Sequence, residues 1–165
     1  MTEIAEILER KKFILRSGGA NGADQAFERG VKHNNKEIFY TDKYNIGKEW
    51  FYEYNKDDLD IAEKFLKAYH PAYKNGGVGI KRSSAKKLLM RNTFQIFGVG
   101  DNTENSKFII CYTPDGAESF TSYDTGGSGQ AIRIAHDYNI PVYNLKNYIG
   151  VTAEEMVNFI LTEVS

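Results

Sequence analysis

Two short glycine-rich turns carry the residue types that bind anions in this chain. The first spans residues 17–24 and reads Ser-Gly-Gly-Ala-Asn-Gly-Ala-Asp, and the second spans residues 125–130 and reads Thr-Gly-Gly-Ser-Gly-Gln. Each follows an apolar strand-like run, the second after an intervening loop, and each precedes apolar residues at helical spacing. Glycines let the backbone approach a ligand closely, and the N–H groups at a helix start favour phosphate. The pattern predicts a phosphate site made by both turns, and a purely structural role for the turns is the alternative.

Charged and aromatic side chains near the turns extend the candidate site. Arg91 and Asn92 fall in the middle of an expected buried helix, where Arg91 needs a carboxylate, a group of carbonyls or a ligand anion as its partner. Asp24 has three open roles: favouring the helix dipole, ordering the turn, or contacting a ribose hydroxyl. The predicted ligand-binding residues are Ser17, Gly18, Gly19, Ala20, Asn21, Gly22, Asp24, Arg91, Asn92, Tyr112, Thr113, Gly126, Gly127, Ser128, Gly129, Gln130 and Arg133.

Other catalytic chemistry is sparse in this sequence. The histidines at 33, 70 and 136 have no spacing to Cys111 or to carboxylates that is typical of a metal site, so we expect no bound metal. Cys111 lies in an apolar run and is expected to be a buried structural thiol. Ser17 lacks the surroundings of a nucleophile elbow, and no pair of carboxylates stands out as acid and base. The sequence therefore identifies no catalytic residue.

Length, composition and charge describe one ordinary globular domain over residues 1–165. Hydrophobic residues make up 41% and charged residues 26% of the chain, and the net charge is −1. This balance gives no overall basic field for nucleic acid or an anionic membrane. No apolar run approaches membrane-spanning length, and the charged N-terminus is unlike a signal peptide. We expect a soluble cytoplasmic protein, in the host cytoplasm if it is viral.

Strand and helix patterns alternate along the chain. Strands are expected at 13–15, 36–40, 108–112 and 140–145. Helices are expected at 2–10, after each glycine turn, at 57–69, from Ser83 or Ser84 to about 97, and from a Thr152–Glu155 capping box to 164. The aromatic stretch 44–54 is read as packing or as a lid, with packing favoured. The expected fold is a single α/β domain, Rossmann-like and doubly wound, with a mainly parallel sheet and helices on both faces.

The first turn, the Met90-Arg91-Asn92 helix and the second turn, in this order, resemble the SLOG superfamily of Rossmann-like domains, over roughly Phe13 to Leu145. That group includes DNA-processing protein A, the Lonely-Guy phosphoribohydrolases and nucleotide-sensing domains of bacterial conflict systems. The closest resemblance is to small proteins of bacteria and phages that are like DNA-processing protein A. Membership implies a pocket for a nucleotide or a nucleotide-derived ligand at the carboxyl edge of the sheet, with no other cofactor required. It also implies pairing into a homo-oligomer.

This chain departs from the hydrolase branch of the superfamily, whose motif is PGGxGTxxE. Thr125 takes the proline position, Gln130 the threonine position and Arg133 the position of the catalytic glutamate. Because a cation replaces the anion, that chemistry is not expected here. The first hypothesis is a non-catalytic binder that senses or sequesters a small phosphorylated nucleotide derivative, with Arg91 or Arg133 neutralising its charge and Tyr112 stacking on its base. The alternatives are a nucleoside 5′-monophosphate N-glycosidase and an accessory protein that binds single-stranded DNA.

Overall fold

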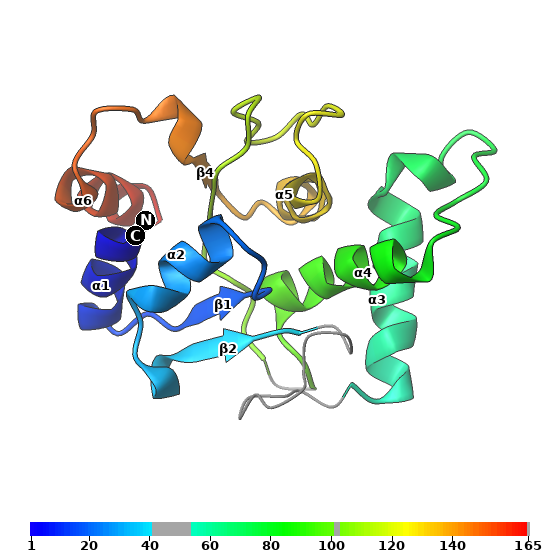
Figure 1. The fold of residues 1–165 in the computed structure, drawn as a ribbon, viewed down its shortest axis with the longest axis horizontal. Coiled ribbons are helices and arrows are strands. Elements are labelled where there is room, and N and C mark those ends of the chain that lie inside the picture. Colours follow the sequence, from blue (N-terminus) through cyan, green and yellow to red (C-terminus); the bar gives the residue numbers. More distant parts are fainter. Residues whose placement is uncertain (41–53, 101–102, 165) are drawn as a thin grey trace.

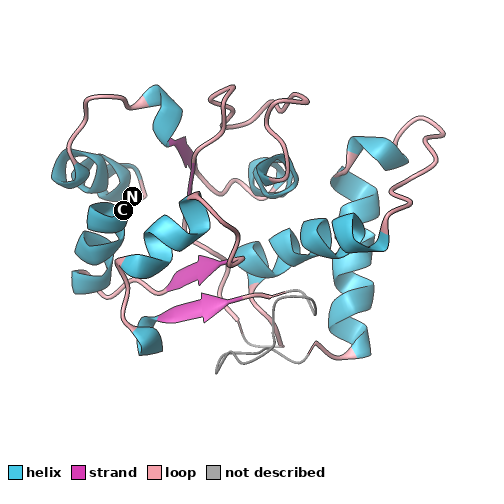
Figure 2. Ribbon diagram, viewed as in Figure 1, coloured by secondary structure: helices cyan, strands magenta, loops and turns pink. Residues whose placement is uncertain are grey.

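The computed structural model describes residues 1–40, 54–100 and 103–164, and it combines helices with short parallel strands (Figures 1 and 2). The described elements, in chain order, are α1 Thr2–Arg10, β1 Leu15–Ser17, α2 Ala23–Arg29, a 3-10 turn His33–Asn35, β2 Lys36–Ile38, α3 Lys56–Tyr69, a 3-10 turn Pro71–Tyr73, α4 Ser83–Phe97, β3 Ile109–Cys111, α5 Ser128–Asp137, β4 Val142–Asn144, a 3-10 turn Leu145–Asn147 and α6 Ala153–Glu163. The α/β composition predicted from the sequence is thereby confirmed.

The strands form two separate parallel pairs within the described residues. β1 pairs with β2 from Leu15 opposite Lys36 to Ser17 opposite Ile38. β3 pairs with β4 from Ile109 opposite Val142 to Cys111 opposite Asn144. Each pair is a βαβ unit, with α2 or α5 in the connection. A single continuous doubly wound sheet, which needs a ladder between β1 and β3, therefore stays a prediction.

The first strand begins two residues later than the apolar run suggested. The amide of Phe13 donates to the carbonyl of Leu8, and the amide of Lys12 donates to Glu9, so these residues close the end of α1. Lys12 has φ 70°, the left-handed conformation that commonly ends a helix. Because the backbone at 12–13 completes the helix, the expected strand 13–15 is corrected to Leu15–Ser17.

Helix α4 packs against both α3 and α5 (Figure 1). Its second half is deeply buried, with Phe94 5% and Ile96 1% exposed. The expected serine cap is wrong, because Arg82 occupies the N-cap and makes no side-chain cap bond. The N-terminal helix α1 packs against the C-terminal helix α6, which begins at the predicted Thr152–Glu155 capping box.

The aromatic stretch 44–54 lies almost wholly outside the described residues, which resume at 54. Tyr54 stacks on Phe94 with ring centroids 4.5 Å apart, and its hydroxyl donates to the carbonyl of Tyr40 at 3.2 Å. Packing is thus observed for Tyr54 alone. None of the described helices is both long enough and apolar enough to cross a membrane.

Candidate functional site

The first glycine turn is ordered by side chains of its own unit. The Asp24 carboxylate accepts a hydrogen bond from the amide of Ala20 at 3.1 Å, and the Ser17 hydroxyl oxygen accepts one from the amide of Gly19 at 3.3 Å. Two amides expected to face a ligand are therefore occupied by protein oxygens. Of the three roles open to Asp24, the structure displays the ordering of the turn.

Behind the turn, Ser17 is held by a carboxylate that the sequence reading missed. Ser17 is only 2% exposed, and its hydroxyl donates to Oε1 of Glu28 at 2.5 Å. Burial raises the pKa of Glu28, while the hydrogen bond from Ser17 acts in the opposite direction. Glu28 follows Asp24 by one helical turn, so both carboxylates lie on the same face of α2. The four-residue spacing of Asp24 and Glu28 in the sequence could have indicated that Glu28 lies beside the turn.

Gly18 and Gly19 leave room for protein groups. A Cβ on Gly18 would lie 2.5 Å from the Arg91 guanidinium carbon. A Cβ on Gly19, which has φ 68°, would lie 2.3 Å from the Tyr40 ring. Both glycines are therefore explained by packing inside the molecule, without reference to a ligand.

Neighbouring residues of α4 connect the two glycine turns. Nη1 of Arg91 donates to the carbonyl of Gly18 at 2.5 Å. Nδ2 of Asn92 donates to the carbonyl of Gly127 at 2.8 Å. Both turns thus lie against the same turn of α4. The three motifs that carried the resemblance meet in space, although they are far apart in the sequence.

The second glycine turn is held by a cluster of hydroxyls around Asp115. The carboxylate accepts hydrogen bonds from the hydroxyls of Ser122 at 2.6 Å, of Thr125, and of Thr113 at 2.7 Å. These bonds lower the pKa of Asp115 below its usual value. Thr113 and Thr125 are 1% and 3% exposed, so they belong to the frame of the loop. The predicted contact of Thr113 with a ligand does not fit this burial.

Gln130 and Arg133 both bond to protein oxygens near α3. Gln130 is fully buried, and its Nε2 donates to the carbonyl of Phe65 at 3.3 Å. Arg133 donates to the carbonyl of Tyr69 at 2.7 Å, to the hydroxyl of Thr121 at 2.7 Å and to Oε1 of Gln130 at 3.2 Å. These bonds hold α5 to α3 and to the loop before the second turn. Arg133 is only partly buried, so its predicted contact with a ligand anion stays a prediction, although the bonds described for it go to protein oxygens.

A few of the predicted residues remain accessible. A Cβ placed on Gly22, Gly126 or Gly127 would meet no atom within 4 Å. Gly129 is different, since its Cβ would lie 3.0 Å from Nη1 of Arg133. Tyr112, at the carboxyl end of β3, is 46% exposed. Asn21 is exposed too, and its Oδ1 accepts a hydrogen bond from Gln25 at 2.9 Å. The open parts of the candidate site are therefore residues 21–22 of the first turn, the second turn and the end of β3.

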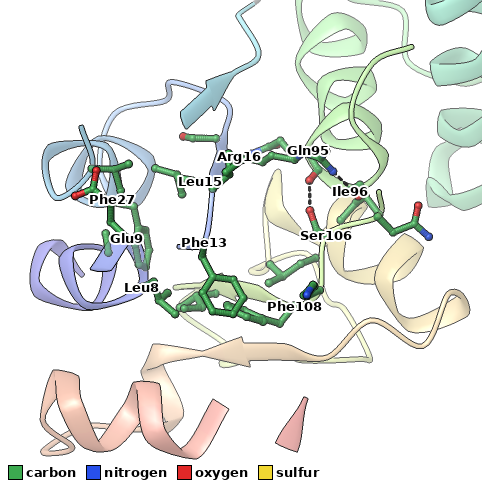
Figure 3. Close-up of a pocket in the computed structure, with 18 of the residues that line it drawn as sticks. Leu8, Glu9, Phe13, Leu15, Arg16, Phe27, Gln95, Ile96, Ser106 and Phe108 are labelled. Carbon is green, nitrogen blue, oxygen red and sulfur yellow. Dashed lines mark hydrogen bonds between the residues drawn. The ribbon is translucent and has the colours of Figure 1, made fainter. Parts of the chain in front are cut away.

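A cavity of about 460 Å³ separates the two strand pairs (Figure 3). Its walls come from β1 with the two residues before it, from the segment 104–110 leading through β3, and from α1 and α2. Ser17 and Asp24 border it at the carboxyl end of β1, and Ala131 borders it from α5. The hydrogen bond from Ser106 to the carbonyl of Gln95, 2.7 Å, closes one side.

The remaining reactive groups have structural environments. Burial raises the pKa of the Cys111 thiol to about 12, so the thiol stays protonated at neutral pH, as a structural cysteine would. His70 accepts a hydrogen bond from the amide of Ala72 at 3.2 Å and so caps a 3-10 turn. Among the described residues, no group of three His, Cys, Asp or Glu side chains is placed to hold a metal ion.

The chain matches no family model, no curated protein and no solved structure in comparisons with known proteins. The resemblance to the SLOG superfamily therefore stays a prediction from the motifs.

Proposed function

We propose that the protein binds a small phosphorylated ligand of the nucleotide class at its second glycine turn, beside α4, without cleaving it. The phosphate is held by backbone amides at the start of α5. The base stacks on Tyr112, which is 46% exposed at the carboxyl end of β3. The guanidinium of Arg91 donates to the carbonyl of Gly18, one residue before Asn92, which holds the second turn. Its positive charge favours the negative phosphate.

The observation that carries this proposal is the glycine at position 127. Its backbone angles are φ −63° and ψ −30°, which any residue adopts. A Cβ there would meet no atom within 4 Å, so packing does not demand glycine either. An alanine would suit both the backbone and the space. A ligand that must approach the backbone closely is a physical reason to keep glycine at this position.

The amides at this turn are available to an anion. The N–H groups of Gly127 and Ser128 donate no hydrogen bond to any described residue, and α5 has no side-chain cap. Such unpaired donors at a helix start attract phosphate, aided by the helix dipole. Asn92 fixes the position of the turn through the Gly127 carbonyl, and the Asp115 cluster fixes the loop that precedes it. The donors are therefore held in place before a ligand arrives.

The proposal includes the fold and family suggested by the motifs. In a SLOG-like domain the two βαβ units lie side by side with the carboxyl ends of their strands at one edge, and a ligand lies at that edge. The meeting of both turns on α4 supports that arrangement. Pairing with a second copy of the chain is part of the same expectation.

The experiment is isothermal titration calorimetry with nucleoside monophosphates, ADP-ribose derivatives and cyclic dinucleotides. We expect at least one class to bind, and Gly127→Ala to weaken its binding by about tenfold or more, equivalent to about 1.4 kcal/mol. The unfolding temperature of Gly127→Ala should stay within about 2 °C of that of the original protein, because the free energy of unfolding changes little. Ser83→Ala, at the exposed start of α4, is the control and should bind normally.

Two results would contradict this function. One is the absence of binding to the whole panel at millimolar ligand, and the other is unchanged affinity in Gly127→Ala. Chromatography of incubated nucleoside monophosphates tests the N-glycosidase alternative, which requires the release of free base. Steeply salt-dependent affinity for single-stranded DNA would favour the remaining alternative.

A further inference from the structure

The cavity between the strand pairs has an apolar interior that the phosphate site does not use. Leu8 and Phe27 enter from α1 and α2, Leu15 and Ile110 from β1 and β3, and Phe13 and Phe108 from the residues just before these strands (Figure 3). A volume of about 460 Å³ is far larger than the voids that close-packed cores leave. It falls within the range of small-molecule sites, about 300–1,000 Å³. The size and the walls fit an apolar molecular body.

Three lysines border the same cavity where the strands begin. Lys12 directly precedes Phe13 and Lys107 directly precedes Phe108, and the two phenyl rings are 5.4 Å apart. The aromatic contact therefore brings the backbone at Lys12 close to that at Lys107, and both residues line the cavity together with Lys11. All three are exposed, and none forms an ion pair with a described residue.

The acidic residues of the cavity do not cancel this charge. The Glu9 carboxylate accepts hydrogen bonds from the amide of Lys32 at 2.8 Å and from Nδ2 of Asn35 at 2.9 Å. Arg16 has its own partner in Glu37 at 2.6 Å, so it adds little to the rim. In all, the lining carries three carboxylates, those of Glu9, Asp24 and Glu104, against three lysines and Arg16, and Asp24 lies at the opposite end of the cavity, where β1 ends. The rim thus keeps a positive excess.

The choice of lysine at position 12 runs against the backbone preference there. Lys12 follows the C-cap of α1 with φ 70°, a conformation in which glycine is normally favoured. Lysine occupies a place where glycine would stabilise the helix end. A use for its charge accounts for this choice.

We infer that the cavity binds a small amphipathic acid, whose apolar body fills the space between the strand pairs and whose carboxylate lies against Lys11, Lys12 and Lys107. The site lies at the start of the strands, whereas the proposed phosphate site lies at the start of α5. It needs no contribution from Gly127 and stands independently of the nucleotide proposal.

The test compares three probes of equal chain length on the intact protein by calorimetry: octanoate, 1-octanol and octylamine. Octanoate should bind with one site per chain. Octanol should bind about tenfold more weakly and octylamine more weakly still, because only the carboxylate complements the lysines. Rising salt should weaken octanoate binding and leave octanol binding unchanged.

Substitutions at the rim separate binding from folding. Lys12→Gly and Lys107→Gln should each weaken octanoate binding by about threefold to fivefold, as expected for a partly exposed ion pair. Lys12→Gly should unfold at the same or a higher temperature, because glycine suits the backbone at this position. Lys74→Gln, an exposed lysine distant in sequence from the cavity rim, is the matched control and should bind octanoate normally.

Methyl nuclear magnetic resonance locates the ligand directly. Octanoate should shift the methyl signals of Leu15 and Ile110 and leave Leu66, which belongs to a different core cluster, unchanged. Any of four results overturns the inference: no octanoate binding at millimolar concentration, equal affinity for octanoate and octanol, normal affinity in both rim variants, or shifts confined to residues outside the cavity.

Discussion

Arg91 and Asn92 are consecutive residues of α4, and each donates a side-chain hydrogen bond to the carbonyl of a different glycine turn. The Arg91 bond to Gly18 measures 2.5 Å and the Asn92 bond to Gly127 measures 2.8 Å. Because both donors are carried by the same turn of one helix, a displacement of α4 moves both glycine turns together. The position of the candidate site is therefore coupled to the packing of α4.

Asn92→Ala should destabilise the fold, because it leaves the Gly127 carbonyl without its buried donor. Asn92 is 6% exposed, whereas Gly127 is exposed and its carbonyl also accepts the amide of Gln130 at 3.4 Å, so the lost hydrogen bond should cost about 0.5–1.5 kcal/mol of unfolding free energy. Urea denaturation measures the change. The control is Asn21→Ala, an exposed amide in the first turn, which should cost less than about 0.5 kcal/mol. Equal effects of the two substitutions would show that the α4 contact is unimportant.

Gly19→Ala should be more harmful than Gly126→Ala, although both residues have similar positive φ angles of 68° and 63°. Gly126→Ala meets no neighbour, so it should cost only the backbone strain, about 1–2 kcal/mol. Gly19→Ala also collides with the Tyr40 ring, which adds about 1–3 kcal/mol of overpacking. Denaturation midpoints measure both values. The explanation from ring packing fails if the two variants are equally stable.

Asp115→Asn should alter how stability depends on pH. The folded-state pKa of Asp115 is held below its unfolded value by hydroxyl donors, so the stabilisation is present above about pH 4 and is lost as pH falls through the folded pKa. The variant should unfold at a lower temperature than the original protein at pH 6, and the difference should shrink toward pH 3. Thermal unfolding at several pH values measures this. If the difference in unfolding temperature between the two proteins does not change with pH, the charge of Asp115 is not its cause.

Glu63→Gln should loosen the attachment of α3 to α4. The Glu63 carboxylate forms ion pairs with Nζ of Lys67 at 2.8 Å and with Nζ of Lys86, on α4, at 2.7 Å. The hydrogen bonds from these lysines lower the pKa of Glu63 to about 2. For such partly exposed pairs we expect a loss of about 0.5–1 kcal/mol at neutral pH, and less in high salt. The contribution disappears as pH falls from about 4 toward 2, because the folded pKa is the lower one.

Thermal unfolding at neutral pH and near pH 2 checks the Glu63 prediction. Lys64→Gln, an exposed neighbour on α3 with no ion pair to a described residue, is the control and should change the unfolding temperature little at either pH. A Glu63→Gln effect that persists undiminished in acid would rule out the ion pairs as its origin.

Local sequence patterns predicted the elements well where neighbours along the chain decide the structure. The helix 2–10 and the Thr152–Glu155 capping box are confirmed, since propensity, spacing and caps act within a few residues. The strand at 13–15 was misplaced, because the same residues also supply the hydrogen bonds that end α1. Ser83 was misjudged as a cap because Arg82, with extended backbone, precedes it.

By itself the sequence determined that two glycine turns each stand between a strand and a helix, because glycine content and apolar spacing are properties of short segments. Only the tertiary structure decided which groups those turns meet. Arg91 reaches Gly18 across 73 positions of the chain, Arg133 turns inward to Tyr69 across 64, and the cavity opens between strands that are distant in sequence. Such contacts depend on how whole helices pack, and no local pattern encodes that packing.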